Sequence, residues 1–229
     1  MKKTLVFICL AVVVSIGMFV YSGYSGFSRV SKGKKIAEYK NPKSALLVID
    51  IQRDLTEKNG KAALNPELTD KIIENTNSLI TNSKKLKFTV VYIRHEFKKS
   101  LLIDYITKGA LAEGSQGAEI DPRINIVNKN MFTKNIMDSF SNKEFEEFLQ
   151  KNEINTLYIT GIDARACIDR TIKAARNRGY GICVIENAIA SKTKKDVEKK
   201  LDEFRKLGIE TVSSQDIIAN LIYGQVYYQ

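Results

Sequence analysis

The chain has 229 residues, of which 44% are hydrophobic and 27% charged, a composition typical of a globular protein that excludes a disordered chain. Its formal net charge of +10 invites a nucleic-acid interpretation, but six basic residues and no acid lie within residues 1–35. The other 30 basic residues are interspersed with 26 acidic ones, and no nucleic-acid-binding motif accompanies them. We therefore expect no nucleic-acid partner.

Residues 1–28 are apolar in a way that is typical of a membrane anchor or a signal peptide. No charge occurs from Thr4 to Ser28, and two lysines precede this stretch. The run is long enough to span a bilayer, and a cleaved secretory signal is the alternative. We expect an uncleaved anchor with an extracytoplasmic domain, secretion after cleavage being the other option. Residues 29–42 are predicted to form a basic polar linker.

The region from residue 43 to residue 229 is predicted to be one α/β domain. Strands are expected at 44–49, 88–93, 124–127, 156–160, 181–186 and 210–212, and helices at 66–80, 142–151, 164–178, 195–207 and from 215. Residues 101–116 are expected to form a loop over the sheet's edge. Alternating strands and helices predict a three-layer α/β/α fold with a mostly parallel, roughly six-stranded Rossmann-like sheet.

Three reactive side chains follow strands of this predicted sheet. Asp50 ends the first strand, Lys134 follows the third after a short connection, and Cys167 follows the fourth. Because functional sites of parallel sheets gather at the carboxyl ends of the strands, we expect these side chains to converge. Each residue has an alternative. Asp50 would then cap the following turn, and Lys134 would be a surface lysine whose role Lys129 takes. Cys167 would be a small buried core residue.

Cys167 is expected to begin a helix. The first amides of a helix have no intrahelical partners, and the helix dipole puts partial positive charge there. This placement predicts a thiol with a lowered pKa, and the free amides are suited to hold an oxyanion.

Cysteine and histidine, the residue types that most often bind zinc, are few in this chain. Cys9, Cys167 and Cys183 have a spacing that fits neither a zinc site nor a disulfide framework, and His95 is the only histidine. We therefore expect no metal and no cofactor.

Three segments carry a resemblance to a known family. They are residues 45–52 (ALLVIDIQ), residues 134–140 (KNIMDSF), and residues 159–171 (ITGIDARACIDRT), the last followed by AARNRGY at 174–180. In this order they resemble the isochorismatase-like cysteine hydrolases, which include nicotinamidases and N-carbamoylsarcosine amidases. The similarity covers residues 43–213.

The resemblance implies roles for individual residues. Cys167 is then the nucleophile, Asp50 the general base and Lys134 the third member of a triad. The backbone amides of Asp163 and Cys167 form the oxyanion hole, and a cis peptide bond joins Ile162 to Asp163. The expected substrate pocket contains Gln52, His95 and Phe140, although Gln52 as a solvated residue and His95 as a packed one are alternatives.

The resemblance also implies a reaction. Nicotinamidases of this superfamily carry a metal site built from an Asp and histidines, which a single histidine does not supply. We therefore expect a metal-independent hydrolase that cleaves a C–N bond of a small amide or carbamoyl substrate through a thioester. An isochorismatase-type hydrolase and a non-catalytic, membrane-tethered binding protein are the alternatives. Members often form dimers or larger assemblies, so a homo-oligomer is also an option.

Overall fold

The computed structural model of the chain describes residues 14, 18 and 22–222. Its strands are β1 (Lys43–Ile49), β2 (Phe88–His95), β3 (Met131–Lys134), β4 (Ile154–Ile162), β5 (Gly181–Ala190) and β6 (Glu210–Val212). They form one sheet in the order β3-β2-β1-β4-β5-β6, and every neighbouring pair is parallel. The predicted fold class is confirmed, with a sheet that is parallel throughout.

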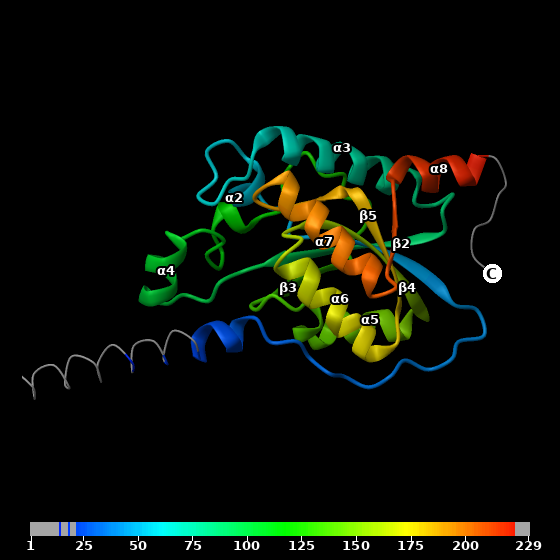
Figure 1. Cartoon of the computed structure of the whole chain (residues 1–229), viewed down its shortest axis with the longest axis horizontal. Helices are drawn as coiled ribbons and strands as arrows, with labels where there is room; N and C mark the ends of the chain where they lie inside the picture. The colour runs from blue at the N-terminus through cyan, green and yellow to red at the C-terminus, as the bar shows by residue number, and fades with distance from the viewer. Residues whose placement is uncertain (1–13, 15–17, 19–21, 223–229) are drawn as a thin grey trace, which may run out of the picture.

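Helices cover both faces of the sheet (Figure 1). They are α2 (Arg53–Thr56), α3 (Pro66–Asn82), α4 (Leu101–Thr107), α5 (Lys143–Lys151), α6 (Cys167–Arg178), α7 (Lys194–Lys206) and α8 (Ser214–Ile222), with 3-10 turns η1 (Gln116–Ala118) and η2 (Ser139–Ser141). α3 and α8 pack on one face, and α5, α6 and α7 on the other. Strand β1 faces both layers, because Leu47 and Leu46 belong to opposite core clusters.

The third strand lies later in the chain than predicted. Residues 124–127 form no strand, and β3 is Met131–Lys134. The Tyr92 hydroxyl donates to the carbonyl of Asn125 and accepts from the amide of Val127, so a side chain replaces ladder hydrogen bonds there. Val127 is 54% exposed. The later strand places Lys134 at the end of β3, in register with His95 on β2.

Two further boundaries differ from the prediction. The expected loop at 101–116 contains helix α4, which has no buried residue. The helix predicted from residue 164 begins at Cys167, because Ala166 has non-helical backbone angles. Cys167 is therefore the first residue of α6, as its candidate role requires.

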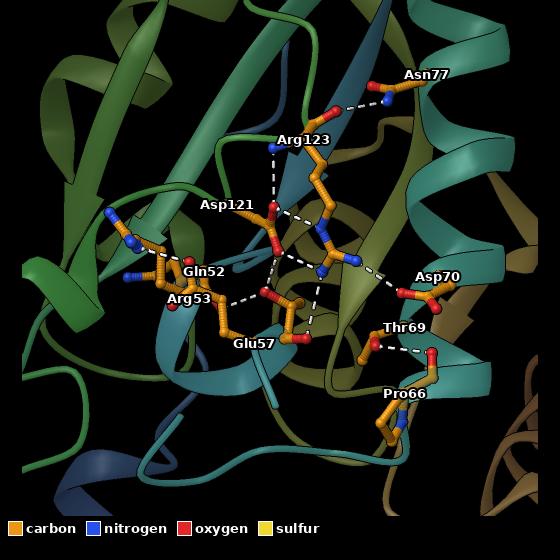
Figure 2. Close-up of polar contacts among 10 residues, drawn as sticks. Gln52, Arg53, Glu57, Pro66, Thr69, Asp70, Asn77, Asp121 and Arg123 are labelled. Carbon is orange, nitrogen blue, oxygen red and sulfur yellow. Dashed lines mark hydrogen bonds and ion pairs between the residues drawn. The ribbon is translucent and has the colours of Figure 1, made fainter. Parts of the chain in front are cut away.

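The connection between η1 and β3 is held against α2 and α3 by one arginine (Figure 2). The Arg123 guanidinium contacts Asp121 at 2.7 Å and Asp70 of α3 at 2.6 Å. Asp121 also accepts a hydrogen bond from the Thr56 hydroxyl of α2. This cluster fixes the segment that follows β1, and so supports one side of the strand ends where the reactive residues lie.

The segment before β1 follows the surface of the domain. Residues 29–42 form no helix or strand, yet Val30 and Ile36 pack against the core. The Ile36 amide donates to the carbonyl of Arg178. Most of the expected anchor at 1–28 lies outside the described residues, and none of the described helices is long and apolar enough to cross a membrane.

Gly161 is the position in β4 where the backbones approach most closely. Its φ is +127°, and an added Cβ would lie 1.9 Å from the Ile49 carbonyl oxygen of β1. We expect Gly161→Ala to lower the free energy of unfolding by about 3–5 kcal/mol, because β1 and β4 must separate. Urea denaturation measures this loss.

Gly208→Ala is the matched control. Gly208 also has a positive φ, +72°, but an added Cβ there meets nothing within 4 Å. This variant should lose only about 1–2 kcal/mol, the cost of the left-handed backbone. Equal losses in the two variants would contradict a steric requirement at Gly161.

Candidate active site

Four polar side chains meet at the carboxyl end of the sheet. Asp50 follows β1, His95 ends β2, Lys134 ends β3, and Cys167 begins α6 after β4. The Lys134 Nζ atom lies 2.7 Å from Asp50 Oδ2, 3.2 Å from Cys167 Sγ and 3.1 Å from His95 Nδ1. The structure thus brings together the three residues expected to converge, and it adds His95.

The backbone at Asp50 turns sharply as the strand ends. Its φ is +54°, in the left-handed region that Asp tolerates better than most residues. Its amide is held by the carbonyl of Ile93 on β2 at 2.8 Å. The turn directs the carboxylate to Lys134, and the Oδ1 atom has no hydrogen-bond partner among the described residues.

The start of α6 leaves two amides unused. Within residues 22–222, the backbone N–H groups of Asp163 and Cys167 donate no hydrogen bond. The peptide bond between Ile162 and Asp163 is cis, as the resemblance implied. The Asp163 carboxylate accepts from the Ser191 hydroxyl at 2.6 Å, which ties this turn to the end of β5.

The lysine and the carboxylate form a buried ion pair. Lys134 is 1% exposed and Asp50 is 2% exposed. Burial by itself lowers the pKa of Lys134, but Asp50 and Cys167 outweigh this effect, so its pKa is raised. Burial raises the pKa of Asp50, and the Lys134 charge opposes that only in part. The contact favours the charged form of both groups, because each ion replaces much of the water that the other has lost.

The thiol of Cys167 does not follow the expectation from its helix position. Burial raises its pKa, and the Asp50 carboxylate raises it further, whereas Lys134 lowers it. The predicted lowering of its pKa was therefore wrong: burial and a neighbouring anion outweigh the helix dipole. The resting site holds a neutral thiol beside an ammonium–carboxylate pair.

His95 is neutral in this site. Burial and the charge of Lys134 lower its pKa to about 2. Because the Lys134 ammonium can only donate, Nδ1 accepts and the proton is assigned to Nε2. Nε2 is buried and has no partner among the described residues.

Cys167 opens onto a cavity of about 430 Å³ whose lining is mostly apolar. Asp50, His95 and Asp163 also line it. The sequence interpretation missed several of its apolar walls: Phe27, Leu55, Phe97, Ile106, Leu111 and Met137. Leu55 and Ile106 lie in the short helices α2 and α4, and the others lie in connections or in the N-terminal segment, so no long periodic pattern distinguishes them.

Three other sequence candidates lie away from this cavity. Gln52 is fully buried, and its amide bonds the backbone of His95 and Ala118, so it joins two chain segments instead of facing the cavity. Phe140 packs in the core against Phe145. Lys129 is exposed, and Lys134 occupies the position beside Asp50 and Cys167.

The donors present do not fit a metal ion. One ligand atom each from Asp50, His95 and Cys167 lie within 4.8 Å of one another. A zinc ion bound by these atoms would lie about 2.0–2.3 Å from each of them, in the space between the three side chains. The Lys134 ammonium already contacts all three residues, so a cation fixed to the chain occupies the centre of this group.

The fold is a parallel α/β sheet with a carboxylate and a lysine at its strand ends and a cysteine at the start of the helix that follows β4. The chain belongs to the isochorismatase family, because the family's Isochorismatase domain model matches residues 44–216. It is a hydrolase of that family. An uncharacterized isochorismatase family protein of Bacillus subtilis, YddQ, is 32% identical over 156 residues, which are 66% of this chain and 79% of the relative.

Solved structures share the fold. A cysteine hydrolase from Pseudomonas syringae pv. phaseolicola superposes with a TM-score of 0.71 at 16% identity, over 84% of this chain and 99% of that one. A pyrazinamidase of Pyrococcus horikoshii in complex with zinc gives a TM-score of 0.65 at 24% identity, over 75% and 99% of the two chains.

Removing the Lys134 charge should lower the free energy of unfolding, because Asp50 stays buried. We expect Lys134→Met to lose about 3–5 kcal/mol of unfolding free energy at pH 8, because a buried carboxylate is left without its cation. The pKa of Asp50 then rises further in the folded state, so the loss is smallest near pH 4 and grows as pH increases. Urea denaturation at several pH values measures this.

The double variant Asp50→Asn/Lys134→Met is the control. It removes both charges, so most of the stability should return and its dependence on pH should flatten. If the double variant is as unstable as Lys134→Met at pH 8, the loss arises from packing and not from the unpaired carboxylate.

Proposed function

We propose that this protein hydrolyses a C–N bond of a small amide or carbamoyl compound through a thioester on Cys167. The observation that carries the proposal is the Lys134 ammonium, which bonds Asp50 and Cys167, two residues that line an apolar cavity. Such a site combines a nucleophile, a base and a fixed positive charge.

The first half of the reaction forms the thioester. Asp50 takes the proton of the Cys167 thiol, and Sγ attacks the substrate's carbonyl carbon. Asp50 Oδ1 supports this role, because it is buried and accepts no hydrogen bond from the described part of the chain, whereas Oδ2 is bound by Lys134. The raised pKa of Cys167 implies that the thiolate forms only as the bond to carbon develops.

The unused amides of Asp163 and Cys167 would hold the oxyanion of the tetrahedral intermediate. Asp50 then returns its proton to the nitrogen, the C–N bond breaks, and an amine or ammonia leaves. In the second half Asp50 takes a proton from water, the hydroxide attacks the thioester carbon, and the proton passes to Sγ as the acid is released. Lys134 keeps its proton and orients both partners throughout.

The cavity supports a substrate with a compact, mostly apolar body. Its lining includes two phenylalanines and several aliphatic side chains, and also two lysines, Lys61 and Lys108. A carbamoyl substrate that carries a carboxylate would be favoured by the lysines, and an uncharged amide by the apolar walls. A hydrolysis screen should therefore include both kinds.

Cys167→Ala should abolish hydrolysis. We expect ammonia release from a panel of primary amides and N-carbamoyl acids to fall by about 10³-fold or more, because the covalent step is lost. Cys183→Ala is the control: Cys183 is buried in β5 outside the cavity, and its variant should retain activity. Equal activity of folded Cys167→Ala and wild-type protein would refute the thioester route.

The pH dependence should report on Asp50. The base must be ionised, so kcat/KM should fall as pH drops through the raised pKa of Asp50, above the ordinary Asp value of about 3.9. A profile from pH 4 to pH 9 measures this limb. Asp202→Asn removes an exposed carboxylate on α7 and should leave it unchanged. Activity that stays level down to pH 4 would contradict Asp50 as the base.

A further inference from the structure

The segment at residues 27–36 lies outside the family domain, but it is not a free linker. The family model begins at residue 44, yet this segment lies along the domain beside α6 (Figure 1). Four described residues donate hydrogen bonds to it: Met137 donates its amide to the carbonyl of Phe27, Arg170 its Nε to the carbonyl of Ser28, and Asn177 and Arg178 both donate to the carbonyl of Ser31. The segment is therefore docked.

Ser31 also donates two hydrogen bonds to a buried carboxylate. Its amide and its hydroxyl both donate to Asp138 Oδ2, at 2.8 and 2.6 Å. Asp138 is buried and also caps η2 through the amide of Phe140, so the attachment reaches into the core. Two residues later, Gly33 adopts a positive φ and crosses directly against the Arg178 guanidinium. The docking fixes the position of Phe27 at the segment's start.

Phe27 lies against the reactive cluster. Its ring packs edge-on to His95, with centroids 5.4 Å apart, and stacks on Phe97 at 5.3 Å. Phe27 and Phe97 line the cavity beside Cys167, and both also line a second cavity of about 720 Å³. The stacked pair is thus a shared wall between the two cavities.

The second cavity differs from the first in its lining. It is bordered by polar and charged residues of the segment after β3 and the start of α5, among them Asn135, Asn142 and Glu144. An acyl group that extended past the shared wall would leave the apolar cavity and enter this second one, whose lining is polar and apolar in similar measure. The wall therefore limits both the length and the polarity of an acyl group beside Cys167.

We propose that Phe27, from outside the family domain, is a specificity-determining residue that closes the substrate cavity and limits the length of the acyl group. The proposal rests on the proposed function only in taking Cys167 as the reacting atom. Phe97 forms the other half of the wall from within the domain. Removing either ring joins the two cavities beside the nucleophile.

Alkylation of Cys167 tests the wall without requiring hydrolysis. The full-length protein is treated with iodoacetamide or with its N-benzyl derivative, and the rate at Cys167 is followed by mass spectrometry of its peptide. In each case Sγ displaces iodide and its proton passes to Asp50 or to solvent. The ratio of the two rates measures the room beside the sulfur.

Phe27→Ala should raise the ratio of the alkylation rate with the N-benzyl reagent to that with iodoacetamide by about 10-fold, the effect of a pocket-wall change of this size. Phe97→Ala should act in the same direction. Phe27→Trp should lower the ratio, an effect that simple detachment of the segment would not produce. Tyr24→Ala is the matched control, since Tyr24 is an exposed aromatic just before this segment that does not line the catalytic cavity, and it should leave the ratio unchanged.

A ratio that changes less than twofold in both Phe27 variants, while Cys167 still reacts with iodoacetamide, would overturn the role of Phe27. An equal change in Tyr24→Ala would also overturn it, because the effect would then belong to the segment's fold. If the ratios shift as expected but no amide is hydrolysed, the wall stands and the proposed reaction fails. The two proposals are thus separated.

Discussion

The structure depends on an ammonium buried at the carboxyl edge of the sheet. Lys134 and Asp50 are almost fully withdrawn from water, and neither charge would be stable there alone. Their contact spans β2: Ile49 of β1 pairs with Ile93, Ile93 pairs with Phe132 of β3, and β3 continues two residues further to Lys134. The same geometry leaves Cys167 on the third side of the lysine, so one electrostatic constraint aligns three strand ends.

The parts of the site that the sequence predicts are those set by strand ends. A continuous apolar run ending in Asp50 identifies a buried strand and its carboxyl end, and Gly161 followed by Cys167 marks a strand-to-helix turn. The third strand was misplaced at 124–127, because its apolar residues resemble a strand although the Tyr92 hydroxyl satisfies their backbone. Lys134 was still placed correctly at this edge, since the connection was expected to be short.

The remaining properties depend on packing between distant segments. The helix position of Cys167 predicted a lowered pKa, but burial and the Asp50 carboxylate have the larger effect, and neither is visible in the local sequence. Gln52 follows a strand like a pocket residue, yet the backbone of His95 and Ala118 engages its amide. Phe27 is one aromatic in an apolar run, and only its contacts with His95 and Phe97 distinguish it.

The fixed cation organises the site through its contacts with Asp50, His95 and Cys167. A metal ion polarises its ligands by a double charge and can be lost, whereas Lys134 carries a single charge that the fold holds in place. Burial and the Asp50 carboxylate outweigh that charge and raise the pKa of Cys167, and burial raises the pKa of Asp50, which favours its acceptance of a proton. The apolar lining of the adjoining cavity favours these interactions, since apolar surroundings screen charges less than water does.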